Sequence, residues 1–297
     1  MSSSTHKTVS LVLGSGGARG LAHIGVIHWL EEHGFKIKSI SGCSMGALVG
    51  GVYAAGKLNG FEQWVCAITK IDMVSLLDLA WSKNGLIKGD KIINSLVDLV
   101  GDQLIEDLPL SFTSVAADIV SEKEVWIQSG NLFDAIRASI SLPLFFTPFT
   151  LNGVDLIDGG VLNPVPIAPT FGDNTDLTIA VNLGGPPEIK QVVEKAPAPP
   201  SFLSEELHDK ISSFISSFQE AVMPNSHDWS AYDVTNQAFE AMQSTIARQK
   251  LAAYPPDITI EVPRNICGIL EFNRASEMIE LGYDMAQKRL SHLLEDT

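Results

Sequence analysis

The chain has 297 residues, of which 45% are hydrophobic and 19% are charged, and its formal net charge at pH 7 is −15. This length is sufficient for one large core, and the composition excludes a fibrous or largely unfolded protein. Nucleic acid is excluded as a partner because phosphate binding requires clustered lysine and arginine. The same charge disfavours electrostatic attraction to an anionic membrane, so any membrane contact is expected to use apolar surface.

The cysteines and the apolar runs bear on the compartment. Cys43, Cys66 and Cys267 lack the spacing of a disulfide framework or a zinc site, and we expect a reducing environment, no metal and no cofactor. The first ten residues carry no apolar signal segment, and no uninterrupted apolar run reaches the roughly 18 residues of a membrane-spanning helix. We therefore expect a cytoplasmic protein, whose contact with a membrane, if any, is peripheral.

The first segments in chain order predict a strand, a glycine-rich loop and a helix. Residues 8–13 (TVSLVL) form a short apolar run that is typical of a buried parallel strand. The loop GSGGARG occupies residues 14–20, and residues 21–33 then carry apolar side chains at helical spacing. A loop in this position presents unpaired backbone N–H groups of a helix N-terminus to an anion.

The loop lacks the residues of two nucleotide-binding motifs, and this narrows the kind of anion that it is expected to bind. A dinucleotide fingerprint would require glycine where the chain has Arg19, and a P-loop would require Gly-Lys-Ser/Thr. The remaining functional interpretation is an oxyanion hole, in which amides near Gly16 and Gly17 point at a developing negative charge. For Arg19, bracing of the loop against a helix C-terminus or a carboxylate is favoured over contact with a substrate phosphate.

The segment ISGCSMGALVGG carries the pattern on which the functional interpretation depends. Gly42, Ser44 and Gly46 form G-x-S-x-G, with a predicted strand over residues 37–41 and a predicted helix over residues 45–55. In such a strand, turn and helix the serine adopts a sparsely populated backbone conformation that presents its hydroxyl as a nucleophile. We expect glycine on both sides because a Cβ there would collide with the tightened backbone.

A nucleophilic serine requires a base, and Asp158 is the best candidate. Residues 154–157 predict a strand, and Asp158-Gly159-Gly160 then predicts a sharp turn with an exposed carboxylate. No histidine lies at the end of a late strand, where an α/β hydrolase carries its base. The seven histidines are His6, His23, His28, His33, His208, His227 and His292. Because a carboxylate is a weaker base than imidazole, such a dyad depends on direct Ser–Asp contact and on the oxyanion hole.

The intervening residues continue an α/β pattern. Helices are predicted over residues 58–71, 88–100 and 132–140, and strands over 112–117, 123–128 and 177–183. The strands 112–117 and 123–128 are expected to pair with each other. Prolines on both sides of Asp158 indicate rigid loops suited to the walls of a site.

The composition changes after Gly184. Residues 184–204 are rich in proline, and we expect a mobile segment. Residues 202–223 predict a helix with one apolar face, either a lid or lipid-contacting helix or a packed helix; its acidic polar face favours packing. Helices over 234–251 and 273–294 and a strand over 257–262 are expected to close the same core.

These motifs resemble the patatin-like phospholipases, in particular their small bacterial members, over about residues 7–182. The resemblance rests on GSGGARG after a first strand, GCSMG after a second, and a later Asp-Gly-Gly. It implies that Ser44 is the nucleophile, Asp158 the base and the glycine loop the oxyanion hole. Many members have three consecutive glycines where this chain has Gly14-Ser15-Gly16-Gly17.

The sequence thus predicts a three-layer α/β/α fold with a mainly parallel central sheet and its site at the C-terminal ends of the strands. Residues 1–183 are expected to form the catalytic core, residues 184–204 the mobile segment, and residues 205–297 a helical part that packs on the same core. Ser44 and Asp158 are the expected catalytic residues of an acyl hydrolase, and the resemblance implies a phospholipid or lysophospholipid ester as its substrate. The expected oxyanion-hole residues are Gly14, Ser15, Gly16, Gly17 and Met45, and the supporting residues are Arg19, Gly42, Gly46, Gly159 and Gly160.

Two other functions stay open on the sequence alone. The same cleft could belong to a catalytically silent protein that binds lipid or a regulatory partner. An acyltransferase of the carrier-protein type also combines a G-x-S-x-G turn with an α/β core, and its base is a histidine.

Overall fold

A computed structural model describes residues 7–68, 88–188 and 231–294 of the chain. The strands are β1 (Thr8–Leu13), β2 (Lys36–Cys43), β3 (Ser111–Asp118), β4 (Lys123–Ile127), β5 (Phe149–Leu151), β6 (Val154–Asp158), β7 (Leu177–Gly185) and β8 (Ile258–Pro263). The α-helices are α1 (Ala22–Glu32), α2 (Met45–Ala54), α3 (Leu58–Ala67), α5 (Asp90–Val100), α6 (Leu132–Ser139), α8 (Ala231–Ala253) and α9 (Ala275–Leu290). Short 3₁₀ helices include η1 (Gly17–Leu21), η3 (Gly159–Val161) and η5 (Phe272–Arg274).

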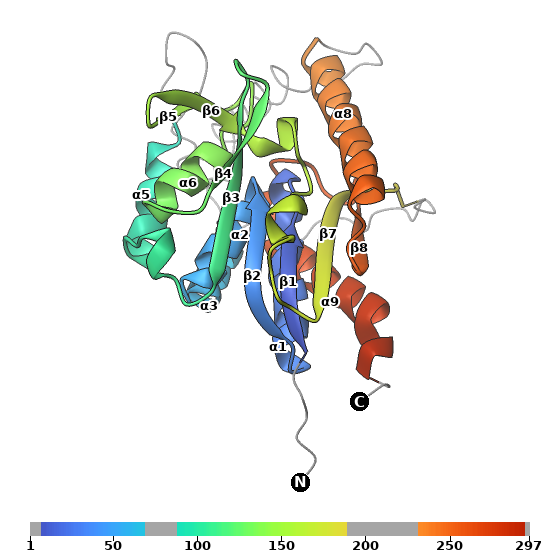
Figure 1. Ribbon diagram of the computed structural model, residues 1–297. Helices are drawn as coiled ribbons and strands as arrows, with labels where there is room; N and C mark the ends of the chain where they lie inside the picture. The colour runs from blue at the N-terminus through green and yellow to red at the C-terminus, as the bar shows by residue number, and fades with distance from the viewer. Residues whose placement is uncertain (1–6, 69–87, 189–230, 295–297) are drawn as a thin grey trace, which may run out of the picture. The chain divides into compact units, whose positions relative to one another are not determined.

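One sheet contains all of the described strands, in the order β5-β6-β3-β2-β1-β7-β8, with β4 paired to β3. The pairs β1–β2, β1–β7, β2–β3 and β7–β8 are parallel, whereas β3–β4, β3–β6 and β5–β6 are antiparallel. Figure 1 shows β3, β2, β1, β7 and β8 side by side in this order. The prediction of a mainly parallel sheet is confirmed, and so is the expected pairing of the β3 and β4 segments.

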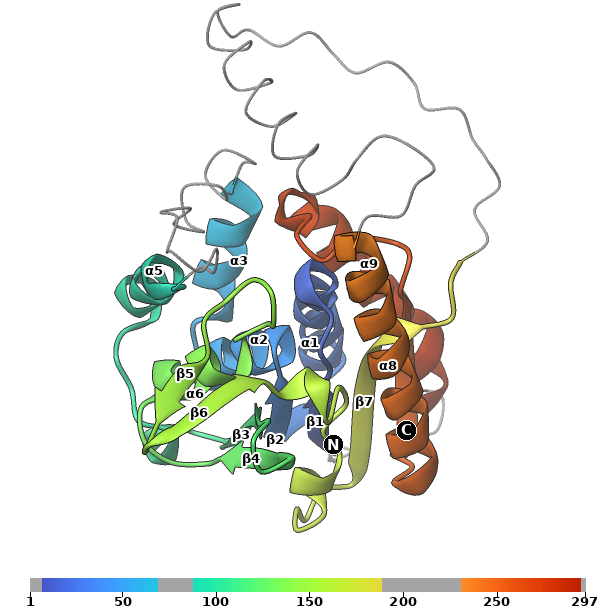
Figure 2. The ribbon, with the colours of Figure 1, turned by 90° about the horizontal axis from the view of Figure 1, so that it is seen from above.

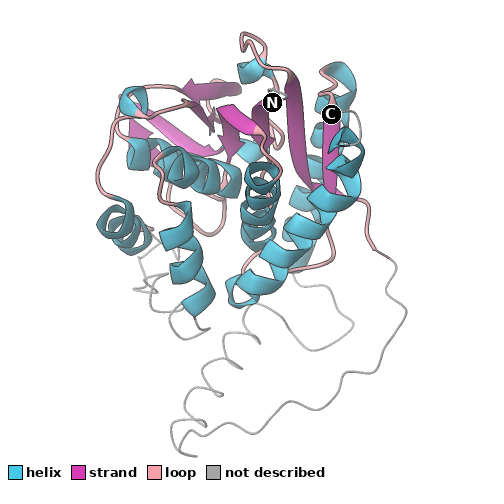
Figure 3. Cartoon of the chain, turned by 90° about the horizontal axis from the view of Figure 1, so that it is seen from below, coloured by secondary structure: helices cyan, strands magenta, loops and turns pink. Residues whose placement is uncertain are grey.

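Side chains alternate between the two faces of the sheet along each strand, so apolar side chains lie on both faces. Helices cover both of these faces. In β1, Val9, Leu11 and Leu13 join the large buried cluster that also holds residues of α1, α2, α6 and α9. Val12 points to the other face, where it packs with Val165 and with Ala247 of α8. Figure 2 shows α1 and α2 together on one side of the strands, and Figure 3 shows helices (cyan) packed beside the strands (magenta) from below. The expected three-layer α/β/α fold is therefore correct.

The helix α1 and the C-terminal helix α9 pack closely because each contributes a glycine to the crossing. A Cβ on Gly25 would lie 1.9 Å from the Ile279 carbonyl oxygen, and a Cβ on Gly282 would lie 1.9 Å from the Ala22 carbonyl oxygen. The Trp29 indole also donates a 2.6 Å hydrogen bond to Gln287 Oε1 across the two helices. This contact holds α9 beside the glycine loop that precedes α1.

Some predicted segments lie outside the described residues, and one described strand was not predicted. The helix predicted over residues 202–223, including its interpretation as a lid, and most of the proline-rich segment lie outside the described part of the chain. Of the described residues, 7–68, 88–188 and 243–294 belong to one compact unit, and residues 231–242 belong to a second. The short strand β5 was not predicted, and none of the described helices is long and apolar enough to cross a membrane.

The Gly282 contact gives a stability prediction. Gly282→Ala should lower the free energy of unfolding by about 1–3 kcal/mol, because the new methyl group overlaps backbone atoms that cannot move separately. Gly60→Ala in α3 is the matched control, since its Cβ would meet only Leu99 Cδ1, at 3.9 Å. Alanine there should raise the free energy of unfolding by about 0.5–1 kcal/mol. Urea titration measures both, and an equal effect of the two substitutions would contradict the packing argument.

Candidate active site

Ser44 occupies the sharp turn between β2 and α2. Its backbone angles are φ 56° and ψ −124°, a conformation that costs a non-glycine residue about 1–3 kcal/mol. A Cβ on Gly46 would lie 2.0 Å from the Leu13 carbonyl oxygen, and a Cβ on Gly42 would lie 2.4 Å from the Gly46 carbonyl oxygen. Glycine is therefore required on both sides of the serine, as the motif predicts.

Ser139, which the sequence analysis missed, supports this turn through hydrogen bonds. The Ser44 backbone N–H donates a 2.8 Å hydrogen bond to Ser139 Oγ, and the Ser139 hydroxyl donates in turn to the Val115 carbonyl oxygen at 2.6 Å. Ser139 is fully buried at the end of α6. The strained backbone of Ser44 is thus tied to β3, and no local pattern around residue 139 distinguishes it from other helix-terminal serines.

Asp158 reaches Ser44 because β2 and β6 share one edge of β3. The last residue of β2, Cys43, pairs with Val115, and the next residue of β3, Ala116, pairs with Asp158 of β6. Both strands lie on the same side of β3, since β4 pairs with Val115 and Ala116 on the other side. The end of β6 therefore lies directly beyond the end of β2. Gly159 is necessary at this point, because a Cβ there would lie 2.2 Å from the Val115 carbonyl oxygen.

The Asp158 carboxylate is fully buried, so the expectation of an exposed carboxylate was wrong. Its Oδ1 accepts hydrogen bonds from the Gly160 amide at 2.7 Å and from the Cys43 thiol at 3.7 Å. Among the described residues, its Oδ2 has no hydrogen-bond partner of ordinary geometry. Burial raises the pKa of Asp158 to about 6, and the Ser44 hydroxyl, the Gly160 amide and the Cys43 thiol oppose that rise. At neutral pH the group is mainly ionised, with one oxygen atom free to accept a proton.

The glycine loop supplies fewer free amides than the sequence predicts. The Gly14 amide donates to the Val181 carbonyl oxygen at 3.0 Å, and the Ser15 amide donates to the Pro164 carbonyl oxygen at 2.8 Å. These two groups are therefore occupied by the structure of the loop itself. Across the described residues, no hydrogen bond is found for the amides of Gly16 and Gly17. The Met45 amide begins α2, where a helix leaves its N–H groups unpaired.

Two buried side chains hold the glycine loop in place. Arg19 Nε donates to the Gly16 carbonyl oxygen at 3.2 Å, and Arg19 Nη1 donates to the Arg264 carbonyl oxygen. Arg19 therefore contacts the backbone of the glycine loop itself and that of Arg264, near the start of the segment that leads to α9. His23 is fully buried, and burial lowers its pKa to about 4. It is accordingly neutral, and its Nε2 lies 2.9 Å from the Gly14 carbonyl oxygen, to which it donates.

Two of the other described histidines, His28 and His33, have partners away from Ser44. His28 Nε2 lies 2.6 Å from Glu62 Oε2, and His33 Nδ1 lies 2.8 Å from the Trp29 carbonyl oxygen. His292 lies in a 3₁₀ helix after α9. Within residues 7–68, 88–188 and 231–294, no group of three or more His, Cys, Asp or Glu side chains could hold a metal ion.

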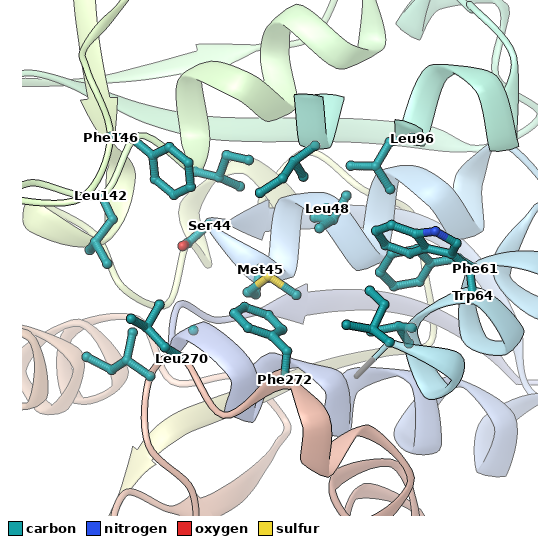
Figure 4. A pocket seen from close by; sticks show the side chains of 16 residues that line it. Ser44, Met45, Leu48, Phe61, Trp64, Leu96, Leu142, Phe146, Leu270 and Phe272 are labelled. Atoms are coloured by element: carbon teal, nitrogen blue, oxygen red, sulfur yellow. The ribbon is translucent and has the colours of Figure 1, made fainter. Parts of the chain in front are cut away.

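Ser44 opens into an apolar pocket with about 780 Å³ of space that protein atoms do not fill, part of it open to solvent. Figure 4 shows the Ser44 hydroxyl between Leu142 and Met45, with Phe61 and Trp64 at the far end of the pocket. All other side chains that line it are apolar: Met45, Leu48, Phe61, Trp64, Val65, Ile68, Ile92, Leu96, Ile140, Leu142, Phe146, Ile269, Leu270 and Phe272. Such a lining suits a hydrocarbon chain more than a polar substrate.

Arg137 joins the two walls of this pocket. Its guanidinium donates to the Lys88 carbonyl oxygen, immediately before α5, and to the Thr147 carbonyl oxygen at 3.2 Å. It also donates to Ser141 Oγ at 2.6 Å and lies 5.5 Å from the centre of the Phe146 ring. The Ser141 carbonyl oxygen in turn accepts from the Asp158 amide at 3.0 Å. One buried side chain thus connects the pocket walls to the backbone of the carboxylate.

Comparison with known proteins identifies the family. The family model for Patatin-like phospholipase matches residues 11–171, more than half of the 297 residues. The chain belongs to the patatin-like phospholipase family. It is 38% identical over 336 aligned residues to an uncharacterized NTE family protein of Mycobacterium tuberculosis, covering 97% of this chain and 92% of that protein.

Other similar proteins are larger than this patatin-like chain. Lysophospholipase NTE1 of Kluyveromyces lactis is 28% identical over 97% of this chain and 20% of that protein. Patatin-like phospholipase domain-containing protein 6 of Homo sapiens is 33% identical over 62% of this chain and 14% of that protein. Among solved structures, VipD from Legionella pneumophila matches with a TM-score of 0.46 and 15% identity, over 98% of this chain and 67% of that chain.

The contact between Cys43 and Asp158 gives a prediction about the carboxylate. Cys43→Ala should raise the pKa of Asp158 above its value of about 6, because the thiol hydrogen bond favours the ionised form. Carboxyl ¹³C NMR over a pH series measures this pKa, with the Asp158 signal assigned by its loss in Asp158→Asn. Cys66→Ala, at an exposed cysteine, should leave the pKa unchanged. A lowered pKa in Cys43→Ala would contradict the assigned role of the thiol.

Proposed function

We propose that this protein is a serine acyl hydrolase that cleaves carboxylic esters of lipids through a Ser44–Asp158 dyad. The observation that carries the proposal is the position of Ser44. Its strained turn lies beside a buried carboxylate with a free oxygen atom, and its hydroxyl opens into an apolar pocket. Membership of the patatin-like phospholipase family supports lipid hydrolysis as the class of activity.

In the first half of the proposed reaction, Asp158 Oδ2 accepts the hydroxyl proton while Ser44 Oγ attacks the acyl carbon. The carbonyl oxygen becomes an oxyanion, for which the amides of Gly16, Gly17 and Met45 are the proposed donors. Each such donor is worth about 10²–10³ in rate. The alcohol leaves with the proton from Asp158, and the acyl group remains esterified to Ser44.

In the second half, Asp158 takes a proton from water, which attacks the acyl-enzyme and releases the fatty acid and a free Ser44 hydroxyl. A carboxylate with an ordinary pKa near 4 would accept a proton from serine poorly. Burial raises the pKa of Asp158 to about 6 and so brings the base closer to the operating pH while it remains ionised. Catalytic hydrogen bonds are often long in the resting enzyme, and substrate binding is expected to tighten the Ser44–Asp158 contact.

We propose a phospholipid or lysophospholipid as the substrate. The apolar pocket beside Ser44 fits an acyl chain, and one relative carries the name lysophospholipase. The reaction as proposed requires no metal or cofactor, because the charge in the transition state is balanced by backbone amides. The polar head group would face away from the apolar lining, toward the open side of the pocket.

The dyad is tested by paired substitutions. Ser44→Ala and Asp158→Asn should each lower kcat for a lipid ester by roughly 10⁴-fold or more, as for other serine nucleophiles. Ser41→Ala is the matched control, because Ser41 is buried in β2, three residues before Ser44, and its hydroxyl has no hydrogen-bond partner among the described residues. It should retain activity and labelling by a fluorophosphonate probe, both of which Ser44→Ala should lose.

Two outcomes of this experiment would overturn the proposal. If wild-type protein neither hydrolyses esters nor reacts with the probe, the chain is a silent binding protein. If one of the single variants His28→Ala, His33→Ala or His292→Ala is as inactive as Ser44→Ala, a histidine-assisted mechanism replaces the dyad.

The pocket gives a prediction on acyl chain length. Leu48 lies one helical turn after Ser44 and lines the middle of the pocket in Figure 4. Leu48→Phe should lower kcat/KM for long-chain esters at least about tenfold more than for short-chain esters, because the ring fills space that only long chains reach. A kcat/KM series over chain length measures this, and an equal loss at all lengths would place the acyl chain elsewhere.

A further inference from the structure

Exposed apolar side chains gather at the end of the sheet that carries Ser44. The turn between β3 and β4 presents Ile119 at 55% exposure and Val120 at 86% exposure, the largest exposure of any large apolar side chain in the described residues. Val154, at the start of β6, and Leu144, in the loop after α6, are also exposed. We call these four residues, Ile119, Val120, Leu144 and Val154, the apolar rim.

The strand register places the rim residues of the β3–β4 and β5–β6 hairpins beyond the turn that contains Ser44. Val115 is level with Cys43, and β3 continues through Ala116, Ala117 and Asp118 before the Ile119–Val120 turn begins. At about 3.3 Å per residue, this turn projects roughly 13 Å past the end of β2. Because Asp118 pairs with Leu156 in the antiparallel β6, Val154 reaches about the same height as Val120.

Leu144 connects the rim to the pocket. It lies between Leu142 and Phe146, which both line the space beside Ser44, and its side chain is 55% exposed. Its φ of 71° is an unfavourable backbone conformation for a leucine. The bonds of Arg137 to Ser141 and Thr147 fix both ends of this loop. The pocket lining thus continues outward to an exposed leucine without an intervening polar side chain.

The hairpin tip is also held in a fixed conformation. Asp118 Oδ1 accepts hydrogen bonds from the amides of Val120 and Ser121, both at 3.0 Å. Two neighbouring apolar side chains are therefore presented to solvent by an ordered turn. An ordered turn loses little conformational entropy when it binds a surface, which favours insertion of its side chains.

We propose that the apolar rim contacts the surface of a lipid aggregate and delivers a lipid molecule from it to Ser44. This inference rests on the proposed function and adds the surface through which the substrate arrives. Leu144 links the rim to the pocket, since its neighbours Leu142 and Phe146 line the apolar space beside Ser44. Acidic Asp118 and Glu122 flank the tip of the hairpin, and the net charge of the chain is −15. Because an anionic lipid surface would repel these charges, the lipid surface in this proposal is zwitterionic.

The experiment measures vesicle binding apart from hydrolysis. Binding of the inactive Ser44→Ala protein to phosphatidylcholine vesicles is followed by sedimentation. Ile119→Ser with Val120→Ser, added to that protein, should lower the bound fraction at least about fivefold, since two apolar side chains no longer enter the lipid. Leu144→Ser should also lower binding, and addition of anionic phosphatidylglycerol to the vesicles should weaken binding of the unsubstituted rim.

Phe171→Ser is the matched control. Phe171 is 62% exposed, and it precedes β7, whose first residues pair with the beginning of β1, at the opposite end of the sheet from Ser44. Its substitution should leave vesicle binding unchanged. In otherwise wild-type protein, the variant with Ile119→Ser and Val120→Ser should lose activity on vesicles at least about fivefold and keep activity on a soluble short-chain ester.

Three results would overturn the proposal. The first is that the rim variants bind vesicles as well as the unsubstituted protein does. The second is that Phe171→Ser loses as much vesicle binding as the rim variants do. The third is that the rim variants change only the molecular mass of the protein in solution, which would make the rim a contact between two copies of the chain. Failure of the proposed function is a separate result, because wild-type protein would then hydrolyse neither the vesicle lipid nor the soluble ester.

Discussion

The candidate active site depends on the pairing of β2 and β6 with successive parts of the same edge of β3. The strand β2 pairs with β3 as far as Val115, and β6 enters from the opposite direction at Ala116. The turn after β2 and the turn after β6 therefore meet, although their residues lie far apart in the sequence. Both turns have so little room that Gly46 and Gly159 would collide with backbone carbonyl oxygens if either carried a Cβ. The strain at Ser44 is sustained because neither strand can shift without breaking its hydrogen bonds to β3.

Burial determines what the carboxylate can do. In water the Asp158 side chain would have a pKa near 4, and its removal from solvent raises this value to about 6. The Gly160 amide and the Cys43 thiol occupy one oxygen atom, and the other has no hydrogen-bond partner in the part of the chain that the structure describes. A stronger set of hydrogen bonds would stabilise the ionised form and return the group to a weak base, whereas complete isolation would leave it protonated at neutral pH. The observed environment lies between these limits.

Much of the fold was predictable from local patterns. The apolar run at residues 8–13 is the strand β1, and GCSMG forms the turn expected between a strand and a helix. These predictions succeed because strand, glycine turn and helix are determined by residues that are close in the sequence. Family membership, implied by the same motifs, is confirmed by the matches to residues 11–171 and to a relative along nearly the whole chain.

The details of the site depend on contacts that no local pattern contains. The amides of Gly14 and Ser15 are occupied because Val181 and Pro164 lie beside them, and both come from distant segments. The burial of Asp158 was missed because an Asp-Gly turn is usually exposed, and here β3 and the turn after β2 cover it. Cys43 was read only as a reduced cysteine, since its contact with Asp158 exists only through the meeting of β2 and β6.

The attachment of both pocket walls to Arg137 constrains how a protein of this fold could diversify. A flat guanidinium with several donors can hold two backbone carbonyls and an aromatic ring at once, which a lysine ammonium cannot reproduce. The gap between the walls is accordingly set by the contacts of this one side chain. New chemical selectivity would then arise by exchanging the side chains that face the cavity, while the frame around them stays the same.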